Sequence, residues 1–139
     1  MRKTALLLLT AIAVMGCDHT SNDNDKNFRE IFRFPKPAGV TIYHSELWHG
    51  RHLFFLLGES SWRMEMDAPD AFVSTLTATG QGIFTRHADN SNFVLSSQRP
   101  SWFAPKASSA YERWDTEDGR GSLFIDKQTK RLYLSDAQL

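Results

Sequence analysis

The sequence predicts an α+β fold: a single small domain with a mainly antiparallel sheet and one short helix. Strand-like segments occupy much of residues 40–66, a helix-like segment follows near residues 68–78, and strand-like segments return up to residue 135. This order of strands, one helix and further strands is typical of α+β domains. After the first 17 residues, the 139-residue chain is long enough for one domain.

Residues 18–27 (DHTSNDNDKN) are polar and acidic, and we expect them to form a disordered tether. Such a run buries too little apolar surface to order itself. Its side-chain oxygens are also of the type that binds calcium, but the central Gly and closing Glu of an EF-hand loop are absent. The domain proper is therefore expected to span residues 28–139, beginning with a short helix or an extended arm over residues 28–37.

The first strands are predicted between residues 40 and 66 as a β-meander. Residues 40–46 are rich in β-branched and aromatic types, and residues 51–57 are their expected antiparallel partner across a turn at His49-Gly50. Residues 61–66 (SWRMEM) alternate apolar and polar side chains, as a half-buried strand does.

The helix is predicted near residues 68–78. Asp67 suits the N-cap position, and Pro69 is tolerated in the first turn. One apolar stripe runs along the segment and comprises Phe72, Val73 and Leu76. The segment is short and rich in Thr, so we expect packing rather than helix propensity to stabilise it.

Further strand-like segments follow the helix. They cover residues 82–86, 92–96, 111–114, 122–126 and 131–135. The last two segments are alternating runs joined by a short polar turn, which predicts a C-terminal hairpin.

The first 16 residues have the pattern of a secretory signal peptide. Arg2 and Lys3 precede a short, mainly apolar run over residues 5–15, and small Gly16 comes directly before Cys17. The apolar run is too short to span a bilayer as a helix, which takes about 20 residues.

The end of this segment, Val14-Met15-Gly16-Cys17, resembles the lipobox of bacterial lipoproteins. The resemblance implies that a diacylglycerol is linked to the sulfur of Cys17, that residues 1–16 are removed, and that the new amino terminus is acylated, for example with palmitate. Several acyl chains on one residue are sufficient for stable membrane attachment. Cys17 is the sole cysteine of the chain, so lipidation would leave no thiol for a disulfide.

The residue after the lipidated cysteine sorts lipoproteins of Gram-negative bacteria between the two membranes. Asp18 at this position resembles the signal that retains a lipoprotein in the inner membrane. The resemblance therefore implies the periplasmic side of the inner membrane, with the outer membrane as the alternative.

The charge balance argues against a nucleic-acid partner. All 16 acidic residues follow Cys17, whereas two of the 16 Lys and Arg residues precede it, so the mature chain is slightly acidic. It lacks the cationic excess that neutralises phosphates.

Three histidines, His44, His49 and His52, lie close together in the sequence near Glu46. Imidazole and carboxylate groups are zinc ligands, but this spacing matches no named metal motif. Scattered surface histidines are the favoured interpretation, and no metal or other cofactor is predicted.

Trp102 and Phe103 lie between Pro100 and Pro105, which places the aromatic pair in a loop. Exposed Trp residues are frequent hot spots of protein interfaces, so this pair is the candidate partner-binding site. By contrast, Trp62 and Trp114 are expected in the core. No G-x-S-x-G motif is present and no catalytic residue is predicted.

The leading hypothesis is a lipid-anchored, non-catalytic binding protein of the cell envelope with a protein partner. The alternative is a metal-dependent or other enzyme that acts on an envelope substrate and uses the three histidines. A third hypothesis is a structural lipoprotein without a dedicated ligand.

Overall fold

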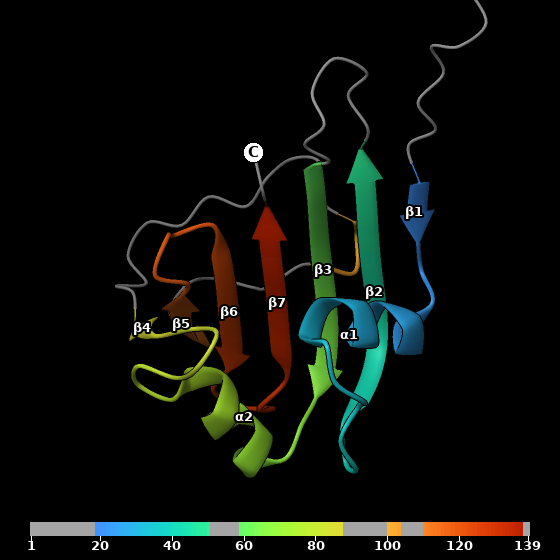
Figure 1. Ribbon diagram of the computed structural model, residues 1–139. Coiled ribbons are helices and arrows are strands. Elements are labelled where there is room, and N and C mark those ends of the chain that lie inside the picture. Colours follow the sequence, from blue (N-terminus) through green and yellow to red (C-terminus); the bar gives the residue numbers. More distant parts are fainter. Residues whose placement is uncertain (1–18, 51–58, 88–99, 104–109, 138–139) are drawn as a thin grey trace, which may run out of the picture.

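The computed structural model describes residues 19–50, 59–87, 100–103 and 110–137. These residues form one seven-stranded antiparallel sheet with both helices on the same face (Figure 1). The predicted α+β fold with a mainly antiparallel sheet is confirmed. The elements in chain order are β1 (His19–Ser21), α1 (Asn24–Phe32), β2 (Thr41–Gly50), β3 (Glu59–Asp67), α2 (Asp70–Thr77), β4 (Arg86–His87), β5 (Tyr111–Asp115), β6 (Gly121–Asp126) and β7 (Leu132–Ala137).

The spatial order of the strands is β1-β2-β3-β7-β6-β5-β4, so the last strand of the chain lies in the middle of the sheet. β7 pairs with β6 as the predicted C-terminal hairpin and with β3 on its other side. Met64 of β3 lies opposite Leu134 of β7, which lies opposite Leu123 of β6. The pairing of β3 with β7 therefore joins the two halves of the chain.

The main hydrophobic core lies between the sheet and the two helices. Met64, Leu134 and Leu123 lie opposite one another on neighbouring strands and have no exposed surface. Phe28 of α1 and Phe72 of α2 lie over them, with ring centroids 6.0 Å apart. Burying a side chain of this size stabilises the fold by roughly 1.5–3 kcal/mol. Trp62 and Trp114 pack at the border of this core, as predicted.

The prediction of a disordered tether over residues 18–27 is wrong for residues 19–27, because these residues form β1 and the beginning of α1. Their polar side chains are used in local contacts. The side chain of Asp23 caps α1 by accepting a hydrogen bond from the N–H of Lys26 at 3.0 Å. Asn27 is fully buried and donates to the carbonyl of Ser21 and to Ser45 Oγ. The folded domain therefore includes residue 19, and residues 28–32 adopt the helical alternative.

The expected turn at His49-Gly50 is also wrong, because β2 continues through both residues and pairs with β3 rather than with residues 51–57. Gly50 leaves room for the ring of Trp48, because a Cβ at position 50 would lie 2.3 Å from that ring. Residues 51–57 and the predicted strand over residues 92–96 lie outside the described residues.

The predicted helix is present as α2, but its N-cap is Pro69 rather than Asp67. Asp67 is the last residue of β3, where its carboxylate accepts hydrogen bonds from two side chains described below. Within predicted strand 82–86, only Arg86 is in a strand; residue 84 is a phenylalanine buried in the core. The predicted strand over residues 111–114 is confirmed as part of β5.

Candidate functional site

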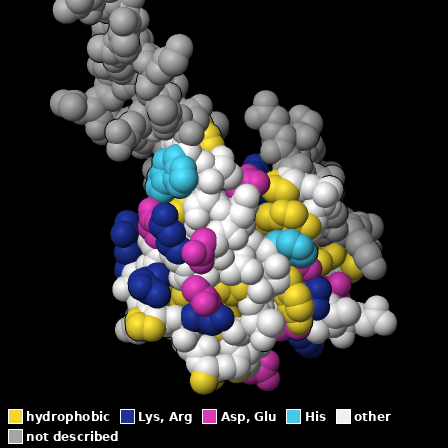
Figure 2. Space-filling model, turned by 90° about the vertical axis from the view of Figure 1, so that its right-hand side faces the viewer, with side chains coloured by type: hydrophobic (Ala, Val, Ile, Leu, Met, Phe, Trp, Pro, Cys, Tyr) yellow, Lys and Arg dark blue, Asp and Glu magenta, His cyan; other side chains and the backbone are white. Residues whose placement is uncertain are grey.

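The candidate site lies on the face of the sheet opposite α1 and α2, which we call the open face. Side chains that alternate with the core residues of β2, β3 and β7 point to it. Figure 2 views the molecule from the β1 edge and shows hydrophobic side chains beside a histidine on the side away from α1. A small aromatic core of Phe103, Tyr111 and Phe124 is buried on this face as well.

A β-bulge in β2 brings two consecutive side chains to the open face. Ile42 lies opposite Met66 and His44 lies opposite Glu65, so Tyr43 is the extra residue between two adjacent partners on β3. A bulge re-aims side chains that would otherwise alternate between the faces. As a result, Tyr43 contacts Asp67 and His44 contacts Glu65 side by side.

Glu65 is the centre of the site. It is only 6% exposed, and each of its carboxylate oxygens has a partner. Oε2 lies 2.8 Å from Nδ1 of His44, and Oε1 accepts a hydrogen bond from Nη1 of Arg131 at 3.0 Å. A buried carboxylate requires such partners, because an unpaired buried charge is strongly destabilising.

Arg131 connects Glu65 to a second acid and to a phenol. Its Nε donates to Oδ1 of Asp67 at 3.1 Å, and its guanidinium carbon lies 3.9 Å from the ring centroid of Tyr43, within cation–π range. Burial lowers the pKa of Arg131, but the hydrogen bonds to Asp67 and Glu65 outweigh this and raise the pKa above its ordinary value. Arg131 therefore stays charged.

The two tyrosines of the site keep their protons. Tyr43 donates a hydrogen bond to Oδ2 of Asp67 at 2.6 Å, and this bond raises the pKa of its phenol. Burial, followed by the negative charge of Glu65, raises the pKa of Tyr133 to about 12. Both phenols are therefore neutral hydrogen-bonding groups at ordinary pH.

Trp102 covers part of this network. Its indole stacks on the imidazole of His44, with ring centroids 5.2 Å apart and an interplanar angle of 13°. The indole is also in edge-to-face contact with Phe103, with ring centroids 5.9 Å apart. Phe103 in turn packs edge-on against Tyr133. Of the candidate partner-binding pair, Phe103 is 2% exposed because it fills the small aromatic core, whereas Trp102 stays partly exposed.

The two described histidines of the alternative metal-site hypothesis lie on opposite faces of the sheet. His44 lies on the open face, whereas Nε2 of His49 lies 2.9 Å from Glu30 of α1 on the other face. His52 and the residues of the predicted lipid site, Cys17 and Asp18, lie outside the described residues. Within the described part of the chain, no group of three His, Cys, Asp or Glu side chains could hold a metal ion.

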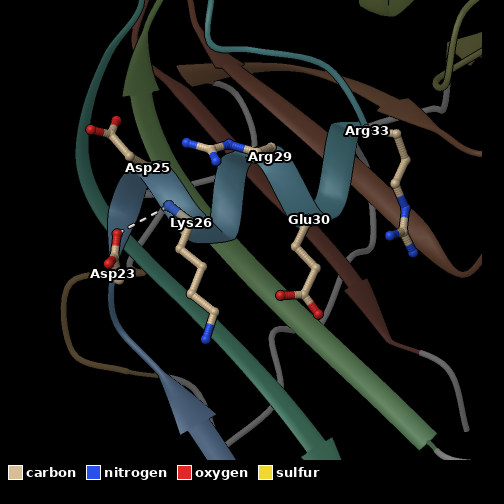
Figure 3. Close-up of a pocket in the computed structure, with 6 residues that line it drawn as sticks. All are labelled: Asp23, Asp25, Lys26, Arg29, Glu30 and Arg33. Carbon is tan, nitrogen blue, oxygen red and sulfur yellow. Dashed lines mark hydrogen bonds between the residues drawn. The ribbon is translucent and has the colours of Figure 1, made fainter.

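A concave region lies along the solvent-facing side of α1 (Figure 3). It is a hollow of about 410 Å³ lined by charged residues: Asp23, Asp25, Lys26, Arg29, Glu30 and Arg33. All of them come from α1 or its two caps. Ligand pockets are usually apolar with a few convergent polar groups, so this charged hollow is a poor candidate for a small-molecule site.

Sequence reasoning singled out His44 and Trp102 separately but missed Tyr43, Glu65 and Arg131. A partial signal was present in residues 61–66, where alternation puts Arg63 and Glu65 on the polar side of a strand. That pattern does not reveal that this side carries a second, smaller core.

Comparison with known proteins finds no matching protein family, no matching curated protein and no matching solved structure. None of the helices in the described residues has the length and apolar character needed to cross a membrane.

Proposed function

We propose that this chain is a lipid-anchored protein of the cell envelope that binds a protein partner, without catalysis, through the open face of its sheet. The observation that carries the binding role is the stack of Trp102 on His44 beside the exposed ring of Tyr43. The membrane attachment is proposed from the first 17 residues, with Cys17 as the lipidated residue.

The composition of the open face suits a protein interface. Tyr, Trp and Arg are the residue types that most often dominate binding energy, and Tyr43, Trp102 and Arg131 lie together here. Tyr43 is 41% exposed, one of three large hydrophobic residues with this degree of exposure among those described. It therefore offers a rigid aromatic contact to a partner.

The charges of this face favour binding because they are already paired within the molecule. Arg131 bonds to both Glu65 and Asp67, and Arg63 lies 3.4 Å from Glu46. A partner that covers the face does not leave any of these charges without a counter-ion. Desolvation of unpaired charges is a main cost of association, and this arrangement reduces it.

Site-specific photocrosslinking in intact cells tests the binding role. A photoreactive amino acid at position 43 should capture one partner, and Trp102→Ala should reduce that capture at least tenfold, because interface hot spots contribute about 2 kcal/mol or more. A probe at position 83 is the matched control, since Ile83 is equally exposed, at 42%, but lies in the connection between α2 and β4. Equal capture at positions 43 and 83, or capture unaffected by Trp102→Ala, contradicts the proposal.

We place the protein on the periplasmic side of the inner membrane because Asp18 follows the lipidated cysteine. Membrane fractionation of the Asp18→Ser variant tests this placement. The variant should move to the outer-membrane fraction. If the unmodified protein is already found in the outer membrane, the alternative location is correct and the sorting role of Asp18 is wrong.

A further inference from the structure

We infer that the folded domain lies directly on the bilayer, with the end of the sheet where β1 begins, β2 ends and β3 begins facing the lipid headgroups. This inference deepens the proposed function, and it rests on the proposed lipid attachment at Cys17. It names the lipid surface as a second contact of the domain, in addition to the protein partner of the open face.

The length of chain between the lipid and the fold is the first reason. β1 begins at His19, two residues after Cys17. Two extended residues reach about 7 Å. The headgroup layer of one leaflet is roughly 5–8 Å thick, taken as half the difference between the whole bilayer and its hydrocarbon core. The first strand therefore begins where the headgroups end.

The second reason is that β1 is held firmly in the sheet. If β1 detached easily, its residues would lengthen the linker between the lipid and the folded domain. β1 pairs with β2 along its whole length, with His19 opposite His49 and Ser21 opposite Leu47. The buried amide of Asn27 also donates to the carbonyl of Ser21 at 2.9 Å. These contacts hold the first folded residues against the sheet.

The antiparallel register determines which end of the sheet faces the membrane. Because β1 pairs with β2 and β2 pairs with β3, the start of β1 lies at the same end as Gly50 and Glu59 (Figure 1). The turn between β6 and β7 lies at the other end of the sheet (Figure 1).

This placement restricts the partner of the open face. His44 is five residues from His49 along β2, which corresponds to roughly 17 Å at about 3.3 Å per residue. The binding face then lies close to the membrane, and the strands run outward from it. The partner is therefore expected to be a protein that is itself held at the inner membrane.

Quenching of a fluorophore by lipid headgroups tests the inference. The acylated protein is reconstituted into phosphatidylethanolamine–phosphatidylglycerol vesicles that contain a lipid with a nitroxide on its headgroup. Lipidation consumes the thiol of Cys17, so a single new cysteine is labelled selectively. Thr20→Cys in β1 and Ser60→Cys in β3 report on the membrane end, and Thr129→Cys in the β6–β7 turn reports on the far end.

Labels at positions 20 and 60 should be quenched several-fold more than the label at position 129. As a matched control, a Gly/Ser spacer of about 16 residues between Asp18 and His19 should remove this difference, because such a linker has an average reach of roughly 20–24 Å. Similar quenching at all three positions, with acylation of Cys17 confirmed by mass, overturns the inference and leaves the lipid anchor intact. Absence of acyl chains on Cys17 overturns both the inference and the proposed lipid anchor.

Discussion

Trp102 stacks on His44 in a nearly parallel arrangement, with ring centroids 5.2 Å apart. The two residues are distant in the sequence, and their contact fixes residues 100–103 to β2 on the open face. The same histidine contacts the buried carboxylate of Glu65, so one imidazole joins the aromatic part of the site to its charged part. The shape of the open face therefore depends on this pair.

The first prediction concerns the energy of this pair. In a double-mutant cycle of His44→Ala and Trp102→Ala, we expect a coupling of about 0.5–1.5 kcal/mol in the free energy of unfolding, as for other stacked aromatic pairs. Urea denaturation of the two single variants, the double variant and the unmodified protein provides the measurement. Additive effects of the two substitutions would show that the stack does not stabilise the fold.

The second prediction concerns the charged centre. Arg131→Met removes the guanidinium that pairs with the buried Glu65, whereas Glu65→Gln removes the buried charge itself. Breaking a buried ion pair typically lowers the free energy of unfolding by about 3–5 kcal/mol. For Arg131→Met we expect a smaller loss, about 2–3 kcal/mol, because the Arg131 side chain is 32% exposed. For Glu65→Gln we expect the free energy of unfolding to fall by about 1 kcal/mol. Denaturant unfolding of both variants provides the comparison, and the reverse order of stabilities contradicts this role of Arg131.

The third prediction concerns alkaline pH. The pKa of Tyr133 is about 12 in the folded protein and 10 in an unperturbed tyrosine. Between these two pH values the unfolded chain loses the phenol proton while the folded protein keeps it, so the unfolded state binds fewer protons and stability falls as pH rises. Below pH 10 this contribution is fully present.

Tyrosinate absorbance during an alkaline titration measures this pKa. Subtracting the Tyr133→Phe titration should isolate a step near pH 12, and Glu65→Gln should move the step to lower pH, because the charge of Glu65 contributes to the shift. A Tyr133 step near pH 10 in the folded protein would show that the phenol is neither buried nor close to that charge.

The fourth prediction concerns the attachment of β1. Asn27→Ala removes the donor to the carbonyl of Ser21 and to Ser45 Oγ. We expect the free energy of unfolding to fall by about 1 kcal/mol, at the lower end of the range for the loss of a buried hydrogen-bond partner. The loss is small because Oδ1 of Asn27 has no hydrogen-bond partner among the described residues. Hydrogen exchange should accelerate at the β1 amides in this variant but not in Asn22→Ala, whose side chain is exposed. Unchanged exchange in Asn27→Ala contradicts the role of this amide in holding β1.

The elements that the sequence predicted well are those specified by local patterns. The C-terminal hairpin and the alternation in residues 61–66 correspond to β6, β7 and β3, because alternating side chains determine which face of a strand is buried. The composition of residues 19–27 was misleading, because polar residues that suit disorder also suit caps and buried hydrogen bonds. Asn27, the buried donor to Ser21, is such a residue.

The candidate site was only partly predictable, because it depends on non-local contacts. His44 and Trp102 could be identified as interesting side chains, but their stack depends on the path of residues 100–103 across the sheet. The bulge at Tyr43 has no clear sequence signal, although it determines that Tyr43 and His44 share a face. Glu65 and Arg131 resemble solvent-exposed charges in the sequence until β3 and β7 are paired.

The most direct test of the account is the intact mass of the protein extracted from membranes. We predict a chain that begins at Cys17, lacks residues 1–16, and carries a diacylglycerol on its sulfur and an acyl chain on its amino group. The same measurement on Cys17→Ser should show neither cleavage before residue 17 nor acylation. A full 139-residue chain with a free Cys17 thiol would contradict the proposal that this protein is held at the membrane by lipid.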